Sequence, residues 1–404
     1  MFTLFAALVL QAPAADEAPL AEQVAAHYLL QADARYGDAL DGATALNRAV
    51  QALLREPTPE AHQAAKEAWI TAHSIYSHTE VFRFGNPNVD AWEGIVNAWP
   101  MDEGLIDYVA DGYVFHHGNP FATWDIVHNG DMPIDEELIA AFADGTDPKA
   151  GYELRMSDVE SNVTTGYHAV EFLLWGQDLN QDPAVHGGQR PHTDFVTGEG
   201  CTGGRCDRRR EYLAAAAGRL MYDLRHIIRD WNGSGRLYGA TFQALPLAEQ
   251  LERMVVGMGS LSYAELASER IRVALLTNDQ EEEQSCFSDT THLATLHNAL
   301  GIQSMYFGQH RKLDGTVVSG PSCSDLVAAL DPELDAALRA ALAETEAAAR
   351  AIVAAAEAGQ PFDRMIIDEG DAGRELLRAL IAKLQAQAEL FEQVRTRVPE
   401  LAAQ

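Results

Sequence analysis

The chain has 404 residues, of which 29 are basic and 60 acidic, so that its formal net charge is −31. Binding to nucleic-acid phosphates requires a basic surface, and we therefore expect no nucleic-acid partner for this acidic protein. With 47% hydrophobic and 22% charged residues, the composition is that of a globular protein and excludes an intrinsically disordered one.

The N-terminus has the pattern of a cleavable signal peptide. An apolar run from Phe2 to Leu10 is followed by an Ala-Pro-Ala sequence at 12–14, which is typical of a signal-peptidase site. The run is too short to cross a bilayer, and no later stretch approaches the ~20 apolar residues that a membrane helix needs. We expect a signal peptide at residues 1–14, an exported protein and no transmembrane segment.

Four cysteines in an exported chain predict disulfide bonds. Cys201 and Cys206 lie five residues apart in a glycine-rich loop, where a local bridge is feasible, and Cys286 and Cys323 then pair by elimination. Two other pairings exist. A zinc site made of four cysteines is a further alternative, although the paired C-x-x-C spacing typical of such sites is missing.

Most of the chain carries helical periodicity. The first helix has Val24 and Tyr28 on one face, and the last has Leu377 and Leu380 on one face. Between them the pattern predicts helices at 59–84, 157–178, 207–232, 246–277 and 332–358, while alternating strand patterns are nowhere sustained. The predicted fold class is all-α, built from helical bundles.

The best candidate for a domain boundary is the glycine-rich segment 231–246. It lies between two long predicted helices and divides the mature chain nearly in half. We therefore expect an N-terminal helical domain at 15–235 and a C-terminal helical-bundle domain at 236–404.

The segment 157–178 is the most informative part of the sequence. Ser157 with Glu160 three residues later forms a capping box, which predicts that a helix begins there. Gly166 removes a side chain within this predicted helix, just before its polar residues.

His168 and Glu171 follow at i and i+3, so that the two side chains share a helix face, and Trp175 continues that stripe. A carboxylate and an imidazole among apolar neighbours are expensive to bury unless they are paired or bind a cation. Two interpretations remain open: a metal site, or a His–Glu hydrogen bond that only satisfies a packing surface.

Three further segments carry candidate binding residues. Glu80 extends an aromatic stripe formed by Trp69 and Tyr76, and Arg83 could hold it ionised; an ordinary buried ion pair is the alternative. Asp102 and Glu103 follow a Trp-Pro corner, where either could simply cap a helix.

In the second half of the chain, Glu269 lies at helical spacing from Glu265. Asp289 and His292 repeat the i, i+3 pattern of acid and imidazole, although a helix N-cap with a nearby surface histidine is the simpler interpretation.

The sequence gives only weak support for an enzymatic activity of the protein itself. Helical zinc-peptidase motifs place two histidines around a glutamate, but Phe172 follows Glu171 and the second histidine is missing. The sequence also lacks a nucleophile elbow, a P-loop and a dinucleotide fingerprint. We expect no catalytic residue from the spacing alone.

The stretch GYHAVEFLLWGQD resembles the imelysin family, whose hallmark is a G-x-H-x-x-E motif, here Gly166, His168 and Glu171. Other segments resemble the iron-regulated protein A branch of that family: TEVFRFG at 79–85, NAWPMDEGLIDYV at 97–109, GQRPHTDF at 188–195, GMGSLSYAELASERIRVAL at 257–275 and SCFSDTTHLA at 285–294. One departure is Gln284, at a position where the resemblance leads us to expect a histidine.

The resemblance implies two helical domains with a site at their junction, in a periplasmic or cell-surface protein of a bacterium that takes part in iron uptake. We expect it to bind iron, as an ion or as haem, or another divalent metal, and to work with an iron-transport membrane partner. The metal ligands would be His168, Glu171 and Glu80. Further binding residues would be Arg83, Asp102, Glu103, Gly166, Trp175, Glu269, Asp289 and His292. The alternative is a metallopeptidase of the imelysin type that activates water with His168 and Glu171.

Overall fold

The computed structural model describes residues 18–113, 119–130, 134–143, 159, 161–179, 185–231, 238–367, 370 and 372–404. The expected signal peptide at 1–14 lies outside these residues. Helices dominate the described part, and the predicted all-α class is confirmed. Within that part, no helix is both long enough and apolar enough to cross a membrane.

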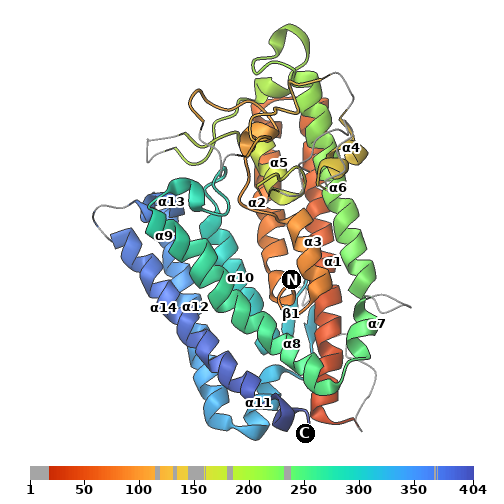
Figure 1. Cartoon of the computed structure of the whole chain (residues 1–404), viewed down its shortest axis with the longest axis vertical. Coiled ribbons are helices and arrows are strands. Elements are labelled where there is room, and N and C mark those ends of the chain that lie inside the picture. Colours follow the sequence, from red (N-terminus) through yellow and green to blue (C-terminus); the bar gives the residue numbers. More distant parts are fainter. Residues whose placement is uncertain are drawn as a thin grey trace, which may run out of the picture.

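The first half of the chain forms a bundle around two long helices, and its elements are α1 (Leu20–Arg55), α2 (Pro59–Ser77), η1 (Glu80–Phe82), α3 (Pro87–Val96), η2 (Glu103–Leu105), α4 (Glu136–Ala143), α5 (Gly166–Trp175), η5 (His192–Phe195), η6 (Gly198–Gly200) and α6 (Cys206–Trp231). Helix α1 packs against both α2 and α6, and it runs along the long axis of the molecule (Figure 1). The short helix α5 packs against α2 and α6.

The second half forms a flatter helical layer, and its elements are α7 (Tyr238–Gln243), α8 (Leu247–Ser260), the π-helix η7 (Leu261–Arg272), α9 (Val273–Thr277), η8 (Gln280–Glu282), α10 (Thr291–Tyr306), β1 (Gln309–Arg311), β2 (Val317–Ser319), α11 (Cys323–Leu330), α12 (Pro332–Glu357), α13 (Phe362–Ile366), α14 (Ala372–Thr396) and α15 (Val398–Leu401). Helix α14 packs against α12, α8 and η7. Strands β1 and β2 form an antiparallel hairpin that the sequence pattern did not predict.

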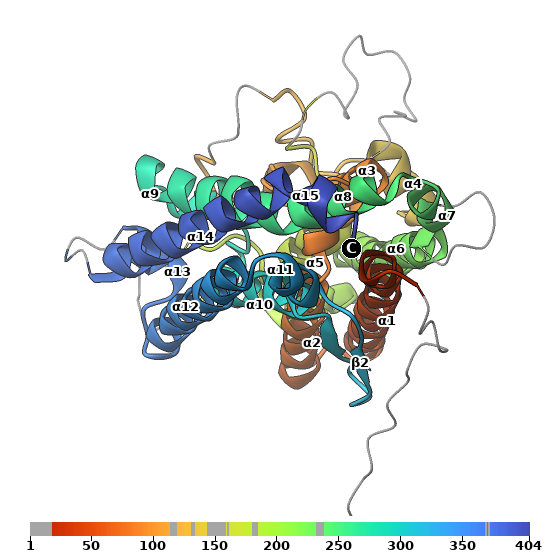
Figure 2. The same cartoon turned by 90° about the horizontal axis from the view of Figure 1, so that it is seen from below.

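The two halves are in broad contact. Helix α10 packs against α2 and η1, and α8 packs against α1, so that the helices of both halves lie side by side when viewed along the long axis (Figure 2). Buried apolar side chains from both halves form one continuous cluster, in which Phe242 of α7 stacks on Tyr28 of α1 with ring centroids 5.2 Å apart. A division into domains at 15–235 and 236–404 stays a prediction.

Two predicted helices differ from the observed ones. The helix predicted at 157–178 begins only at Gly166, and residues 162–165 are not helical; Ser157 and Glu160 lie outside the described residues. Here Thr165 donates a hydrogen bond to the Ile95 carbonyl at 3.1 Å, which ties the chain to α3 and delays the helix start.

The helix predicted at 59–84 ends at Ser77. Asn298 of α10 donates a hydrogen bond to the Ser77 carbonyl, and Thr79 folds back onto the Tyr76 carbonyl at 2.7 Å. The last carbonyl groups of α2 are therefore used by partners outside the helix, and η1 follows as a separate turn.

The predicted Cys201–Cys206 bridge is confirmed. The predicted Cys286–Cys323 bridge is wrong, because neither of these buried cysteines forms a disulfide bond. Cys286 precedes the start of α10, whereas Cys323 lies near Tyr306 at its far end. A helix of 16 residues is about 24 Å long, far beyond the ~7 Å between Cα atoms that a disulfide can span.

Candidate functional site

The centre of the candidate site is a buried ion pair between Glu80 of η1 and Arg270 of the π-helix. The Arg270 guanidinium donates to both Glu80 carboxylate oxygens, at 2.7 and 2.9 Å. Asn97 donates to Glu80 Oε1 at 2.9 Å, and Asn298 donates to Oε2. Burial alone would raise the pKa of Glu80, but the charge and hydrogen bonds of Arg270 outweigh it and hold that pKa well below its usual range. Glu80 is therefore an anion whose two oxygens are both satisfied.

A second carboxyl group, Glu93 of α3, lies beside this ion pair. Asn97 donates to Glu93 Oε1 at 3.0 Å, and the Tyr76 hydroxyl donates to Oε2 at 2.5 Å. Burial and the neighbouring negative charge of Glu80 raise the pKa of Glu93. The two carboxyl groups thus differ in their tendency to ionise, and Glu80 holds the negative charge.

The cation that holds Glu80 ionised is Arg270 rather than Arg83. Arg83 instead pairs with Asp90 at 2.8 Å and with Glu265 at 3.3 Å. Glu265 also accepts a hydrogen bond from Arg270 Nε at 3.0 Å. These two residues stand at i and i+5, the repeat of π-helical hydrogen bonding. The π-helix therefore brings Glu265 onto the same side as the arginine that binds Glu80.

His168 and Glu171 of α5 form the second part of the site. Both side chains are fully buried, and His168 Nδ1 lies 2.7 Å from Glu171 Oε2. Glu171 Oε1 accepts hydrogen bonds from the Ser288 amide at 3.0 Å and from the Ser288 hydroxyl at 2.6 Å. His168 Nε2 is buried and has no hydrogen-bond partner among the described residues.

Burial changes the protonation of both groups. It lowers the pKa of His168 to about 3, with a further contribution from the positive charge of Arg270. It raises the pKa of Glu171 to about 8, against the hydrogen bonds from Ser288 that favour the carboxylate. Near neutral pH the His168 ring is therefore uncharged.

His73 of α2 connects the two parts. Its ring lies 5.2 Å from that of His168, between centroids, and its Nε2 lies 2.9 Å from Asn97 Oδ1. Trp69 stacks on His73 at 4.8 Å, and Trp175 packs edge-on against Trp69 at 5.5 Å. Trp175 thus belongs to the aromatic packing behind His168.

We call the connected set the polar centre, and its members are His73, Glu80, Glu93, Asn97, His168, Glu171 and Arg270. They come from α2, η1, α3, α5 and η7, and partners from the turn before α10 and from α10 itself complete their hydrogen bonds. Residues from before and after segment 231–246 therefore build one site.

A cavity of about 440 Å³ adjoins the polar centre, and its lining includes Glu93, Asn97, Thr165, Glu265, Glu269, Arg270 and Gln284. Glu269 is exposed there. Gln284 is 2% exposed, and its side-chain oxygen has no hydrogen-bond partner among the described residues. The cavity thus contains both charged groups and an unsatisfied amide.

Asp102 and Glu103 organise the loop beside this cavity. Asp102 is fully buried and accepts hydrogen bonds from Asn119 at 2.7 Å and from the Ser161 hydroxyl at 2.6 Å. Asn119 also donates to Asn162, which lines the cavity. Glu103 is buried and begins η2. Asp102 therefore supports the cavity wall at Asn162 through Asn119.

Gly166 allows α5 to approach α3 closely. Its φ is +84°, and a Cβ atom there would lie 2.5 Å from the Val96 carbonyl oxygen and 2.6 Å from that of Ile95. A larger residue would push α5 away from α3. The glycine therefore sets the position of His168 relative to Asn97, which follows α3.

Asp289 and His292 lie close to this region in the turn before α10 and in its first turn. Asp289 Oδ2 accepts a hydrogen bond from the Gly187 amide at 2.7 Å. Burial lowers the pKa of His292 to about 4. Asp289 belongs to a separate group of carboxylates with Asp178 and Asp363.

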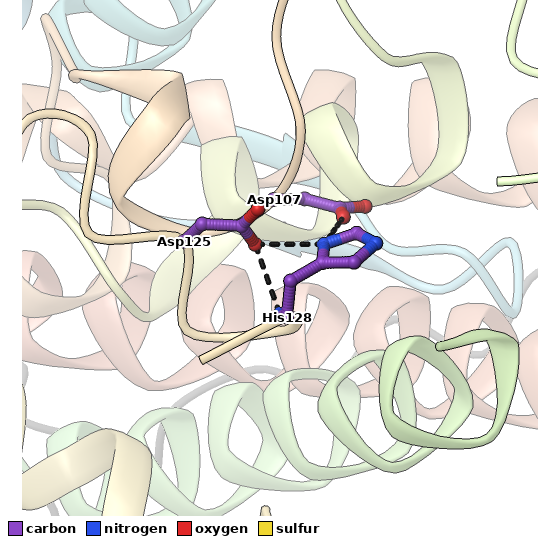
Figure 3. A group of neighbouring side chains, drawn as sticks. All are labelled: Asp107, Asp125 and His128. Atoms are coloured by element: carbon purple, nitrogen blue, oxygen red, sulfur yellow. Dashed lines mark hydrogen bonds and ion pairs between the residues drawn. The ribbon is translucent and has the colours of Figure 1, made fainter. Parts of the chain in front are cut away.

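Asp107, Asp125 and His128 also come together, as Figure 3 shows. His128 Nδ1 lies 2.9 Å from Asp125 and 3.6 Å from Asp107. However, Arg190 donates to Asp107 at 2.7 Å, and Arg209 donates to both of its oxygens at 2.5 and 2.9 Å. Two guanidinium groups already neutralise this carboxylate, which makes the group a poor cation site.

The sequence spacing did not single out Arg270, Asn97, Asn298 or Ser288. Helical periodicity cannot reveal Arg270, Asn298 and Ser288, because each bonds a residue far away along the chain. Asn97 lies just beyond the end of α3, where the periodic pattern stops. A weaker signal existed, since Asn97, Arg270 and Ser288 all lie in the segments that carry the family resemblance.

Comparisons with known proteins fit this structure. The model of the family described as Imelysin matches residues 32–391. Iron-regulated protein A of Synechococcus elongatus is 37% identical over 65 residues, which are 16% of this chain and 18% of that protein. The match therefore spans less than a fifth of the relative's length.

Two solved structures share the fold over nearly the whole chain. One is described as an iron-regulated protein A precursor of Parabacteroides distasonis, with a TM-score of 0.66, 19% identity and coverage of 96% of both chains. The other is an imelysin-like protein of Psychrobacter arcticum, with a TM-score of 0.54, 14% identity and coverage of 95% of both chains.

Proposed function

The chain belongs to the imelysin family, and we propose that it is an exported accessory protein of bacterial iron uptake. In this proposal it binds iron, as an ion or within an iron-bearing ligand such as haem, at the polar centre. The Cys201–Cys206 disulfide supports an oxidising compartment such as the periplasm or the cell surface. A membrane protein that transports iron would be its partner.

The observation that carries the proposal is the Nε2 atom of His168, which is buried and has no hydrogen-bond partner in the part of the chain that the structure describes. A buried nitrogen without a hydrogen bond is costly, and a metal ion would satisfy it. The lowered pKa keeps the ring uncharged, as a metal ligand must be. Imidazole is a suitable ligand for iron.

The contacts of Glu171 are those of a residue that orients a metal-binding histidine. They are not those of a residue that binds the metal itself. Its carboxyl group binds His168 Nδ1 on one side and Ser288 on the other. Metal-binding histidines commonly have their second nitrogen bonded to a carboxylate, which fixes the ring and its tautomer. In the refined proposal, Glu171 positions His168 through this hydrogen bond.

Glu80 would have to leave Arg270 in order to bind a metal. In the refined proposal it instead keeps Arg270 in place at the cavity wall, where the side-chain oxygen of Gln284 has no hydrogen-bond partner among the described residues and can bind a ligand. A cavity of about 440 Å³ lies in the lower part of the roughly 300–1,000 Å³ range of small-molecule sites. That size favours a hydrated iron ion or a small iron chelate over haem.

The test is calorimetric titration of the chelator-treated protein with ferrous ion, ferric citrate, zinc and haem, each in a separate experiment. We expect one iron site per chain, with affinity reduced roughly 10–100-fold in Glu171→Gln and lost in His168→Ala. His226→Ala, in α6 and outside the polar centre, is the control histidine variant and should bind like the wild type. Unchanged binding in His168→Ala would exclude this residue as the ligand.

The metallopeptidase alternative predicts a different result in the same preparations. It requires cleavage of unfolded substrates such as casein that disappears in His168→Ala and persists in His226→Ala. The proposed function expects no His168-dependent cleavage, because a zinc peptidase needs about three protein ligands and a bound water. Near His168, Asn97 already occupies His73 Nε2 and Ser288 occupies Glu171.

A further inference from the structure

Three carboxylates from distant parts of the chain meet next to the polar centre. Asp178 follows α5, Asp289 lies in the turn before α10, and Asp363 belongs to α13. One oxygen from each lies within 4.8 Å of the other two. The chain thus concentrates carboxyl groups at a point where three segments converge.

Two of these carboxylates are buried and only half satisfied. Asp363 is 1% exposed; its Oδ2 accepts a hydrogen bond from Gln280 at 2.7 Å and contacts Arg364 Nε at 3.1 Å. Asp289 is 4% exposed, and its Oδ2 is held by the Gly187 amide. The Oδ1 atom of each residue is buried without a hydrogen-bond partner among the described residues.

A fourth buried carboxyl group nearby, that of Glu283, also has an oxygen that lacks a hydrogen bond from the described residues. Glu283 is 1% exposed, and its Oε2 also has no hydrogen-bond partner in the described part of the chain. Besides burial, the charges of Asp289 and Asp363 raise the pKa of Glu283, which shows that the three groups interact. Buried oxygens of this kind cost free energy unless something binds them.

Basic side chains also lie next to these carboxylates in the described part of the chain. Arg364 contacts Asp363, and the half-exposed His186 lies 3.9 Å from Asp289 Oδ2. Burial, with the charges of Asp363 and Asp178, raises the pKa of Asp289 to about 8. This is the opposite of the Asp107 group, where two guanidinium groups bind one carboxylate directly.

We propose that Asp178, Asp289 and Asp363 bind a hard divalent cation of the calcium or magnesium class, at a site separate from the His168 iron site. Such ions prefer carboxylate oxygens over imidazole or thiolate. Oxygens on opposite sides of a calcium ion lie about 5 Å apart, twice the 2.3–2.6 Å bond length, so separations within 4.8 Å fit a single ion. The Oδ1 atoms of Asp289 and Asp363, which have no hydrogen-bond partner among the described residues, would supply two of the ligands.

Calcium is the better fit within this class. The three carboxylates come from a loop, a turn and a short helix, which together give an irregular arrangement that calcium accepts. Magnesium requires near-ideal octahedral geometry and releases its water reluctantly. One bound calcium ion would hold the loop after α5, the turn before α10 and α13 together.

The experiment is calorimetric titration and thermal unfolding of chelator-treated full-length protein with calcium, and in parallel with magnesium and manganese. We expect one calcium site per chain and an unfolding temperature that rises with calcium concentration. Asp363→Asn and Asp178→Asn should each weaken calcium binding by roughly tenfold or more. Asp178 is only half-buried, so its variant keeps the test valid if Asp363→Asn folds poorly.

Two controls isolate the site. Asp41→Asn removes one exposed carboxylate from α1 and should bind calcium like the wild type. The calcium titrations are run without iron, so that failure of the iron proposal leaves this result unaffected. The proposal is overturned if the wild type shows no calcium, magnesium or manganese response at millimolar concentrations. Equal binding in all variants would overturn it too, since the ion would then sit elsewhere on the acidic surface.

Discussion

His168 and Glu171 show how burial reverses the usual preferences of two side chains. In water an imidazole holds its proton up to a pH near 6.5, and a glutamate loses its proton near 4.3. Here burial lowers the pKa of His168 to about 3 and raises that of Glu171 to about 8. The pair is therefore electrically neutral over a wide pH range, and a metal ion that binds Nε2 replaces a proton held by the pair.

Replacement of Glu80 tests the buried ion pair. In Glu80→Gln, the Arg270 guanidinium stays buried without its carboxylate, and we expect the free energy of unfolding to fall by about 3–5 kcal/mol in urea titrations. The control is Glu375→Gln, which breaks the exposed pair with Arg378 and should cost under about 1 kcal/mol. Equal losses in the two variants would mean that the buried ion pair stabilises the protein no more than the exposed pair does.

Asp107 provides a test of pH dependence. Burial would raise its pKa, but the charges and hydrogen bonds of Arg190 and Arg209 outweigh burial and lower it. A carboxylate with a lowered folded-state pKa stabilises the protein above its unfolded pKa of about 3.9, and this contribution disappears as pH falls through the folded-state value.

We therefore expect Asp107→Asn to be much less stable than the wild type at pH 7. The difference in unfolding free energy should shrink as pH falls below about 4, because Asp107 is protonated first in the unfolded chain and, at lower pH, in the folded protein. Urea unfolding at a series of pH values measures it. A difference that stays constant down to the lowest pH would show that Asp107 does not depend on its two arginines.

At the residue scale, the sequence predicts only contacts between neighbours on one helix. The i, i+3 spacing correctly placed His168 and Glu171 on one face, because helix geometry alone decides that. It could not identify Arg270 as the partner of Glu80, 190 residues away, and it proposed Arg83 instead. Such pairings depend on tertiary packing, which no local pattern encodes.

Among the elements, the helix predicted at 246–277 is continuous but not uniform. Periodicity of 3.6 residues correctly predicted its extent from α8 to α9, yet its middle twelve residues form the π-helix Leu261–Arg272. π-helical segments are rare and usually mark functional regions. Here the wider turn aligns Glu265 with Arg270, a pairing that an α-helical pattern does not predict.

The start of α5 depends on Gly166, which yields a prediction at the element scale. In Gly166→Ala, the added Cβ would clash with the Val96 and Ile95 carbonyl oxygens at a φ of +84°. We expect a loss of about 3 kcal/mol or more in unfolding free energy, together with weaker iron binding, because α5 carries His168.

The matched control is Gly37→Ala in the middle of α1. A Cβ atom there meets nothing within 4 Å, and Ala is the better helix former, so stability should rise by about 0.5–1 kcal/mol. Circular dichroism during urea unfolding measures both variants. A Gly166→Ala variant as stable as Gly37→Ala would show that α5 can move away from α3 without cost.

At the scale of the whole molecule, the buried cluster does not stop at the glycine-rich segment 231–246. Phe242 packs between Tyr28 and Trp231, and the polar centre takes residues from both halves. We therefore expect one cooperative transition in scanning calorimetry, with calorimetric and van't Hoff enthalpies that agree. Two separate transitions would instead support independent domains at 15–235 and 236–404.

The all-α class followed from the sequence because long amphipathic patterns report the solvent-facing and core-facing sides of each helix. The sequence pattern did not predict the hairpin β1–β2, because strands of three residues are too short to show an alternation of polar and apolar residues. Helix α10 was missed for a related reason: it is buried on most sides, so that its polar and apolar residues do not separate into faces.

Ser288 and Asp289 are consecutive residues whose side chains contact different groups. Ser288 binds Glu171, which positions His168, and Asp289 belongs to the carboxylate group. A single peptide unit thus joins the two proposed ligand sites, and any shift that one ligand imposed on it would be transmitted to the other. Thermodynamic linkage makes that influence reciprocal: calcium would alter the affinity for iron by the same factor by which iron alters the affinity for calcium. An accessory protein built in this way would release its cargo according to the divalent ion concentration of its surroundings.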